Sequence, residues 1–137
     1  MDILFEDVNY HEVISKPIKS SFLPIEKEPM KVDIPSLEDF MGDKLTAFAP
    51  NTTGIPYFKN EDSMSMEIIK QLFDIGSLFD VVNNVDIIIK TFNLFAETEL
   101  SYREQKGLKP YDVLEDIYQT SLCIVTRGTD GKGDFNE

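Results

Sequence analysis

The chain has 137 residues, of which 42% are hydrophobic and 28% charged, and its formal net charge is −12. This length suits one domain with a single core, and the composition excludes disordered and fibrous proteins. The acidic balance argues against non-specific nucleic-acid binding, because the phosphates would be repelled. A single cysteine excludes an internal disulfide and a cysteine zinc cluster. Without a long apolar run or a signal peptide, the sequence predicts a soluble, cytoplasmic domain with no membrane partner.

The first 35 residues favour extended structure. Met1–Glu6 is mostly apolar and predicts a short buried strand, followed by a broken extended stretch over His11–Phe22 that contains Pro17. Met30–Ile34 alternates apolar and polar side chains and ends at Pro35. Because Met1–Glu6 begins without a polar lead-in, we expect it to be a strand cut from a larger sheet.

Helical periodicity dominates after residue 35. Ser36 is a good N-cap for the first helix, which should end before Pro50, and Gly107 is a plausible C-cap for the third. The four helices are expected at about 36–48, 63–80, 85–105 and 111–125. The predicted fold class is α+β in a single domain: a short antiparallel β part at about 1–35, a helical bundle at 36–127, and a mobile Gly-rich tail at 128–137.

Lys44 lies on the apolar face of the first predicted helix. Leu37, Phe40, Met41 and Phe48 form a stripe at helical spacing, and Lys44 falls near its middle. Because an unpaired buried ammonium is costly, the side chain either reaches solvent at the edge of the helix or binds an anion, such as a phosphate or a carboxylate in a cleft. Position alone leaves both interpretations open.

Two aspartates are further candidates. Asp74 lies beside the core face of the second predicted helix and one turn after Lys70, so a solvated flank with a weak Lys70–Asp74 pair is the simpler interpretation. Asp2 lies in the apolar first strand. A carboxylate there is either frayed into solvent or needs hydrogen bonds, a lysine or a metal ion.

Several apparent motifs are excluded. Gly76-Ser77 has the form of the Gly-Ser signature of nucleotidyltransferase sites, but it lies inside a predicted helix and no Asp-x-Asp strand follows. Gly131–Gly133 lacks the spacing of a P-loop. The only histidine, His11, is expected to be structural or at the surface, and Cys123 to pack as a small hydrophobe.

Two segments nevertheless carry a recognisable pattern together. In Val32–Phe48 a strand and Pro-Ser lead into a helix that contains Lys-Leu-x-Ala, and in Lys70–Leu78 a basic residue is followed by Asp-Ile-x-x-Leu. These segments resemble the middle and later motifs of the AbiEii/AbiGii-type nucleotidyltransferase toxin family. Asp2–Phe5 is similar to the core strand after the metal motif of that family, so the resemblance covers about residues 1–105.

The resemblance implies a nucleotidyltransferase-like fold with a helical second half. Lys44 would hold the nucleoside triphosphate, Asp74 would help to assemble the active site, and Asp2 would be the third carboxylate that binds Mg²⁺. Family members transfer a nucleotide to an RNA or protein acceptor, and many are abortive-infection toxins paired with a cognate antitoxin. We therefore expect this chain to be the C-terminal part of such an enzyme.

The sequence departs from the family in two ways. Gln71 stands where the family often has the first of two acids, and the Gly-Ser and Asp-x-Asp segments are absent. Two-metal transfer needs those carboxylates, so we expect no transferase activity from the isolated chain. The alternatives are a non-catalytic binding or assembly module, forming a homodimer through an open strand edge at Met1–Glu6, or a nucleotide-binding domain that retains phosphate affinity through Lys44.

Overall fold

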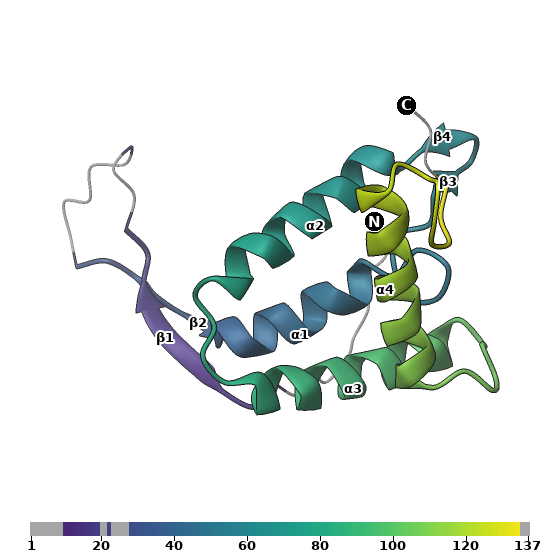
Figure 1. Cartoon of the computed structure of the whole chain (residues 1–137). Helices are drawn as coiled ribbons and strands as arrows, with labels where there is room; N and C mark the ends of the chain where they lie inside the picture. Colours follow the sequence, from purple (N-terminus) through teal and green to yellow (C-terminus); the bar gives the residue numbers. More distant parts are fainter. Residues whose placement is uncertain (1–9, 20–21, 23–27, 135–137) are drawn as a thin grey trace.

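The computed structural model of the chain describes residues 10–19, 22 and 28–134. This part is α+β, as predicted, with two small antiparallel sheets and four helices (Figure 1). The elements follow in the order β1 (Val13–Pro17), β2 (Lys31–Pro35), α1 (Leu37–Ala47), β3 (Phe58–Lys59), β4 (Asp62–Ser63), α2 (Ser65–Phe79), α3 (Val85–Tyr102) and α4 (Pro110–Val125). The strand expected at Met1–Glu6, and Asp2 with it, lies outside the described residues. None of the described helices is long and apolar enough to cross a membrane.

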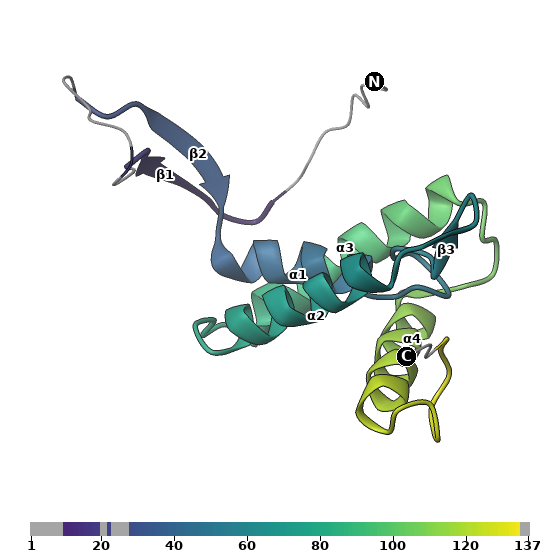
Figure 2. The same cartoon turned by 90° about the horizontal axis from the view of Figure 1, so that it is seen from above.

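The central helix is α1, which packs against α3 on one side and α2 on the other (Figure 1). Gly42 allows the close approach to α3, because a Cβ at this position would lie 2.7 Å from Cβ of Thr91 and 2.9 Å from the backbone N of Phe92. The fourth helix, α4, runs across the ends of the other helices instead of along them (Figures 1 and 2). One cluster of buried apolar residues lies around α3 and α4 and consists of Ala49, Phe92, Ala96, Leu100 and Val113.

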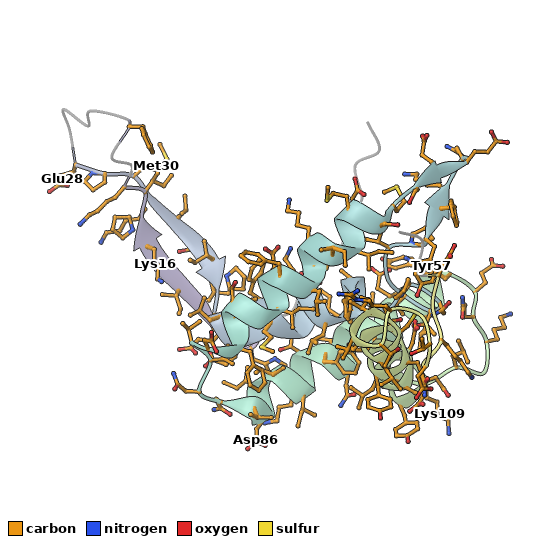
Figure 3. All side chains as sticks on the ribbon, turned by 45° about the horizontal axis from the view of Figure 1, so that its top comes forward. Lys16, Glu28, Met30, Tyr57, Asp86 and Lys109 are labelled. Atoms are coloured by element: carbon orange, nitrogen blue, oxygen red, sulfur yellow. The ribbon has the colours of Figure 1, made fainter. Side chains whose placement is uncertain are left out.

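The β1–β2 hairpin projects away from the helices (Figure 2). Its strands pair antiparallel, from Val13 opposite Pro35 to Pro17 opposite Lys31. Its side chains, including those of Lys16 and Met30, stand apart from the bundle (Figure 3). Because the sheet has only two strands, each strand leaves one edge unpaired within the described part of the chain.

A buried carboxylate connects this hairpin to the helices. Asp39 is 0% exposed, and its two oxygens accept hydrogen bonds from the backbone N–H groups of His11 (3.0 Å) and Glu12 (2.9 Å) and from the hydroxyls of Ser36 (2.8 Å) and Thr91 (2.5 Å). Burial alone would raise the pKa of Asp39, but these hydrogen bonds outweigh it and lower the pKa from 3.8 to about 2. The side chain is therefore ionised and fully partnered at neutral pH.

A second buried carboxylate fixes the loop after α1 to α4. Asp116 accepts hydrogen bonds from the backbone N–H and the side-chain amide of Asn51 (2.9 and 2.6 Å) and from the hydroxyls of Thr52 (2.9 Å) and Thr120 (3.3 Å). From the end of α3, Arg103 donates to the carbonyl oxygens of Thr52 (3.3 Å) and Gly54 (3.0 Å). These bonds satisfy the polar groups of a turn that would otherwise be costly to bury.

The expected apolar faces are only partly buried. On α1, Met41 and Phe48 are 4% and 1% exposed, whereas Leu37 and Phe40 are 41% and 37% exposed. The spacing of these residues identified the apolar face of α1, but nothing among the described residues fully covers the outer part of that face. Cys123 is buried and free, as predicted.

The described residues of the C-terminal segment, 128–134, return toward α4. The backbone N–H of Lys132 donates to the carbonyl oxygen of Gln119 at 3.2 Å. Gly131 has a φ of 81°, and a Cβ there would lie 2.4 Å from the same carbonyl oxygen. This turn therefore requires glycine at that position.

Candidate functional site

The structure brings Lys44 and Asp74 together. Nζ of Lys44, on α1, donates to Oδ2 of Asp74 at 3.0 Å and to Oε1 of Gln71 at 3.0 Å. Gln71 and Asp74 are three residues apart on α2, which places both side chains on one face of that helix. Of the two interpretations left open for Lys44, the structure shows anion binding, and the anion is a carboxylate of the chain itself.

The environment of Lys44 is partly shielded from solvent. The side chain of Lys44 is 21% exposed and that of Asp74 is 32% exposed, so the pair is neither fully buried nor freely solvated. The ammonium also lies 5.4 Å from the centroid of the Phe40 ring, within the range of a cation–π contact. Phe40 thus helps to hold the lysine in place without neutralising its charge.

The ammonium retains capacity to bind another group. A lysine ammonium has three N–H donors, and among the described residues two of them bond to α2. One donor is therefore left for a further acceptor, such as a phosphate oxygen. Gln71 is neutral. Its hydrogen bond with the ammonium therefore positions Lys44 without adding negative charge to the site.

The neighbouring acids define the electrostatics of this site. Burial raises the pKa of Asp43, and the positive charge of Lys44 partly opposes that rise. Burial also raises the pKa of Tyr10, helped by the negative charges of Asp43 and Asp39. The carboxylates of Asp43 and Asp74 lower the positive potential around Lys44, so a phosphate there would depend on direct contact with the ammonium.

Two sequence interpretations can now be compared with the geometry. Asp74 pairs with Lys44 from another helix and not with Lys70, the partner that the simpler interpretation assigned to it. Gly76 and Ser77 lie inside α2, where the Ser77 hydroxyl donates to the carbonyl oxygen of Phe73 at 3.0 Å, so this segment does not form a phosphate-binding turn. Sequence reasoning did not assign Gln71 a role, although its three-residue spacing from Asp74 was a usable signal.

The described residues do not assemble a metal site. Within that part of the chain, no group of three or more histidine, cysteine, aspartate or glutamate side chains could hold a metal ion. Asp74 is already bound by an ammonium, and Asp2 lies outside the described residues. The side chains of residues 10–19, 22 and 28–134 therefore do not fit Mg²⁺.

His11 also differs from a simple surface residue. Its Nδ1 lies 3.2 Å from Oδ1 of Asp39 and 3.0 Å from the hydroxyl of Thr91, while its side chain is 37% exposed. The hydroxyl of Thr91 donates to Asp39, so its oxygen is available to accept from His11. The contacts are those of a structural histidine that joins the start of the hairpin to α1 and α3.

Comparisons of the chain with protein-family models, with curated proteins and with solved structures gave no match. The resemblance to the AbiEii/AbiGii-type family therefore rests on the two sequence motifs alone. What the structure adds is that the lysine of one motif contacts the aspartate of the other.

Proposed function

We propose that the chain is the helical, nucleotide-binding part of an AbiEii/AbiGii-like nucleotidyltransferase, in which Lys44 binds the triphosphate. The observation that carries the proposal is the contact of 3.0 Å between Lys44 and Asp74, two motif residues that are 30 positions apart in sequence. A pair of unrelated surface charges has no reason to coincide with both motifs. The geometry supports a specific role for this lysine.

In this proposal the two partners on α2 orient the lysine. Asp74 forms a charge-assisted hydrogen bond, which is shorter and stronger than a neutral one and fixes the direction of the ammonium. Gln71 supplies the second bond. The remaining donor of Lys44 would contact a phosphate oxygen, and its compact positive charge would stabilise the negative charge that develops on the leaving pyrophosphate.

Mg²⁺ and the transfer step belong to the complete enzyme. The described residues do not fit the metal, so we derive no step through it. An RNA or protein acceptor, a toxin activity and a cognate antitoxin enter this proposal through the resemblance alone. The chain by itself should bind nucleotide and transfer none of it.

A second candidate function, that of a non-catalytic assembly module, is favoured by the β1–β2 hairpin. A projecting two-stranded sheet whose edges are unpaired by the described residues is a common place for another strand to pair. Sedimentation velocity distinguishes the candidates, because an assembly module should form a dimer in the absence of nucleotide.

Lysine footprinting tests the proposed function. The full chain would be acetylated with a lysine-reactive ester, with and without a nucleoside triphosphate, and the acetylation of each lysine quantified by mass spectrometry. We expect nucleotide to protect Lys44 from acetylation. Lys70, which is exposed on α2, should be acetylated equally in both samples. Equal acetylation of Lys44 with and without nucleotide would contradict the proposal.

A transfer assay tests the remaining part. Incubation of the chain with labelled nucleoside triphosphates, Mg²⁺ and total tRNA should label neither the RNA nor the protein. Robust labelling would show that transfer does not require the carboxylates of an Asp-x-Asp segment, and it would contradict this part of the proposal.

A further inference from the structure

The last helix, α4, has apolar side chains on two opposite faces. Its buried face contains Val113 and Cys123, which are 0% and 4% exposed. On the other side, the helical period places four exposed apolar residues within about 60° of one another. These residues, called here the α4 outer stripe, are Tyr111 (72% exposed), Leu114 (50%), Tyr118 (59%) and Val125 (80%).

A groove lies beside the α4 outer stripe. A shallow groove with a volume of about 460 Å³ runs along it, lined by Tyr111, Leu114, Glu115, Ile117, Tyr118 and Ser121. The exposure of the four stripe residues shows that this side of α4 is not covered by the described parts of the other helices. Tyrosine is enriched at protein interfaces because it combines a large apolar ring with a polar tip, and contiguous exposed apolar patches mark interaction sites.

Within α4 itself, all charged side chains are negative. Over its 16 residues α4 contains no lysine, arginine or histidine, and its charged side chains are Asp112, Glu115 and the buried Asp116. Glu115 borders the groove and accepts a hydrogen bond from Gln119 at 2.9 Å. Basic side chains lie outside the helix, at Lys109 before it (Figure 3), at Arg127 after it, and at Lys132, whose backbone N–H bonds to the carbonyl oxygen of Gln119.

We propose that the α4 outer stripe docks a positively charged amphipathic helix of a partner protein. Such a helix would place its apolar side chains in the groove at helical spacing and its basic side chains beside Glu115. A second copy of this chain fits less well, because two chains of net charge −12 would bring Glu115 close to a like charge. Nucleic acid and anionic lipid are disfavoured for the same electrostatic reason. The inference is independent of the proposed nucleotide site, which lies on α1 and α2.

The test uses a defined probe. The probe is a fluorescein-labelled, 18-residue amphipathic helical peptide of leucine and lysine, and binding to the full chain is followed by fluorescence anisotropy. A peptide of the same composition with a scrambled, non-amphipathic order controls for attraction to the acidic protein as a whole. We expect the amphipathic peptide to bind at least about tenfold more tightly than the scrambled one.

Matched variants locate the binding surface. Tyr118→Ser should weaken binding of the amphipathic peptide about tenfold, because it removes the central anchor of the stripe. Glu115→Gln should weaken binding and reduce its dependence on salt. The control is Phe73→Ser, which removes an equally exposed aromatic residue (73%) from α2 and should leave binding unchanged. Circular dichroism of each variant confirms that it is folded.

Four results would overturn the proposal. The first is equal binding of the amphipathic and scrambled peptides, and the second is equal loss from Phe73→Ser and Tyr118→Ser. The third is a dimer in sedimentation velocity that Tyr118→Ser dissociates, which would make a second copy the occupant. The fourth is binding to RNA or to vesicles containing phosphatidylserine that Tyr118→Ser abolishes, because this would assign the stripe to a different class of partner.

Discussion

Replacing Asp39 with alanine tests whether this carboxylate fastens the hairpin to the helical bundle. Asp39 is fully buried, and its hydrogen-bond donors come from the start of the hairpin (His11 and Glu12), from the N-cap of α1 (Ser36) and from α3 (Thr91). Truncation to alanine removes all of these acceptors at once. The hairpin stem and the first turn of α1 should therefore loosen together.

The magnitude follows from the number and kind of bonds lost. Each of the four donors loses a bond to an ionised acceptor, and a donor left without a partner in a buried site costs about 1 kcal/mol or more. Because His11 and Glu12 are near solvent, water can replace part of this loss. We expect the free energy of unfolding to fall by about 3 kcal/mol, which is a large part of the roughly 5–15 kcal/mol that stabilises a domain.

Urea unfolding, followed by circular dichroism at 222 nm, measures this change. The matched control is Asp86→Ala, which removes an exposed acid from the first turn of α3 and should change stability by no more than about 0.5 kcal/mol. Hydrogen exchange should also show faster exchange of the β1–β2 amides in Asp39→Ala than in Asp86→Ala. Equal stability of the two variants would refute the assignment of Asp39 as a fastening residue.

The same residue predicts a dependence of stability on pH. The pKa of Asp39 is about 2 in the folded chain and 3.8 ordinarily, so the ionised form is favoured by folding. Its contribution is complete above pH 3.8 and is lost as the pH falls toward about 2. The difference in stability between the wild type and Asp39→Asn should therefore shrink between pH 4 and pH 2, and a constant difference across that window would contradict the shift.

The remaining predictions concern the α1–α3 contact and the lysine site. Gly42→Ala should destabilise the chain by about 1–3 kcal/mol, because the added Cβ would lie 2.7 Å from Thr91. Gly76→Ala, inside α2 with no atom within 4 Å of the added Cβ, should stabilise it by about 0.5–1 kcal/mol. Urea unfolding measures both, and effects of the same sign would contradict the described packing. Gln71→Glu should weaken nucleotide binding roughly fivefold in calorimetry, because a negative charge about 4 Å away costs about 1 kcal/mol even in water. An unchanged affinity would remove Gln71 from the site.

Local signals made the helices predictable. Ser36 caps α1 through its hydroxyl, which accepts from the backbone N–H of Asp39 at 3.1 Å, and Pro110 opens α4 at a position where its missing N–H is harmless. These features act within one turn, so the sequence contains them in full. Burial was predicted less well, because periodicity identifies an apolar face but not the element that covers it.

The β3–β4 hairpin shows a different limit. Its turn residues Asn60 and Glu61 have φ values of 49° and 73°, which are typical of a two-residue hairpin turn. Asparagine is common in such turns, whereas a glutamate with positive φ is not. The sequence therefore indicated no strand between the helices expected at about 36–48 and 63–80, where the short hairpin lies.

The sequence predicted only part of the candidate site. The unusual place of Lys44 on an apolar face could be read from spacing alone, but its partner depends on how α1 and α2 pack, across 30 positions of sequence. The contacts of Asp39 with His11 and Thr91 span 28 and 52 positions and were invisible for the same reason. Long-range pairing of polar groups is set by tertiary structure, which no local pattern encodes.

The central claim is that Lys44 binds the phosphates of a nucleotide. Isothermal titration of the full chain with a nucleoside triphosphate tests it most directly, using Lys44→Ala and, as the matched control, Lys70→Ala on the exposed flank of α2. Both variants remove one positive charge, so general electrostatic attraction changes equally in the two. The account predicts that Lys44→Ala abolishes binding or weakens it by at least about tenfold, while Lys70→Ala binds like the wild type. Equal affinities of the wild type and Lys44→Ala would contradict the claim and would leave the Lys44–Asp74 pair as a structural contact between two helices.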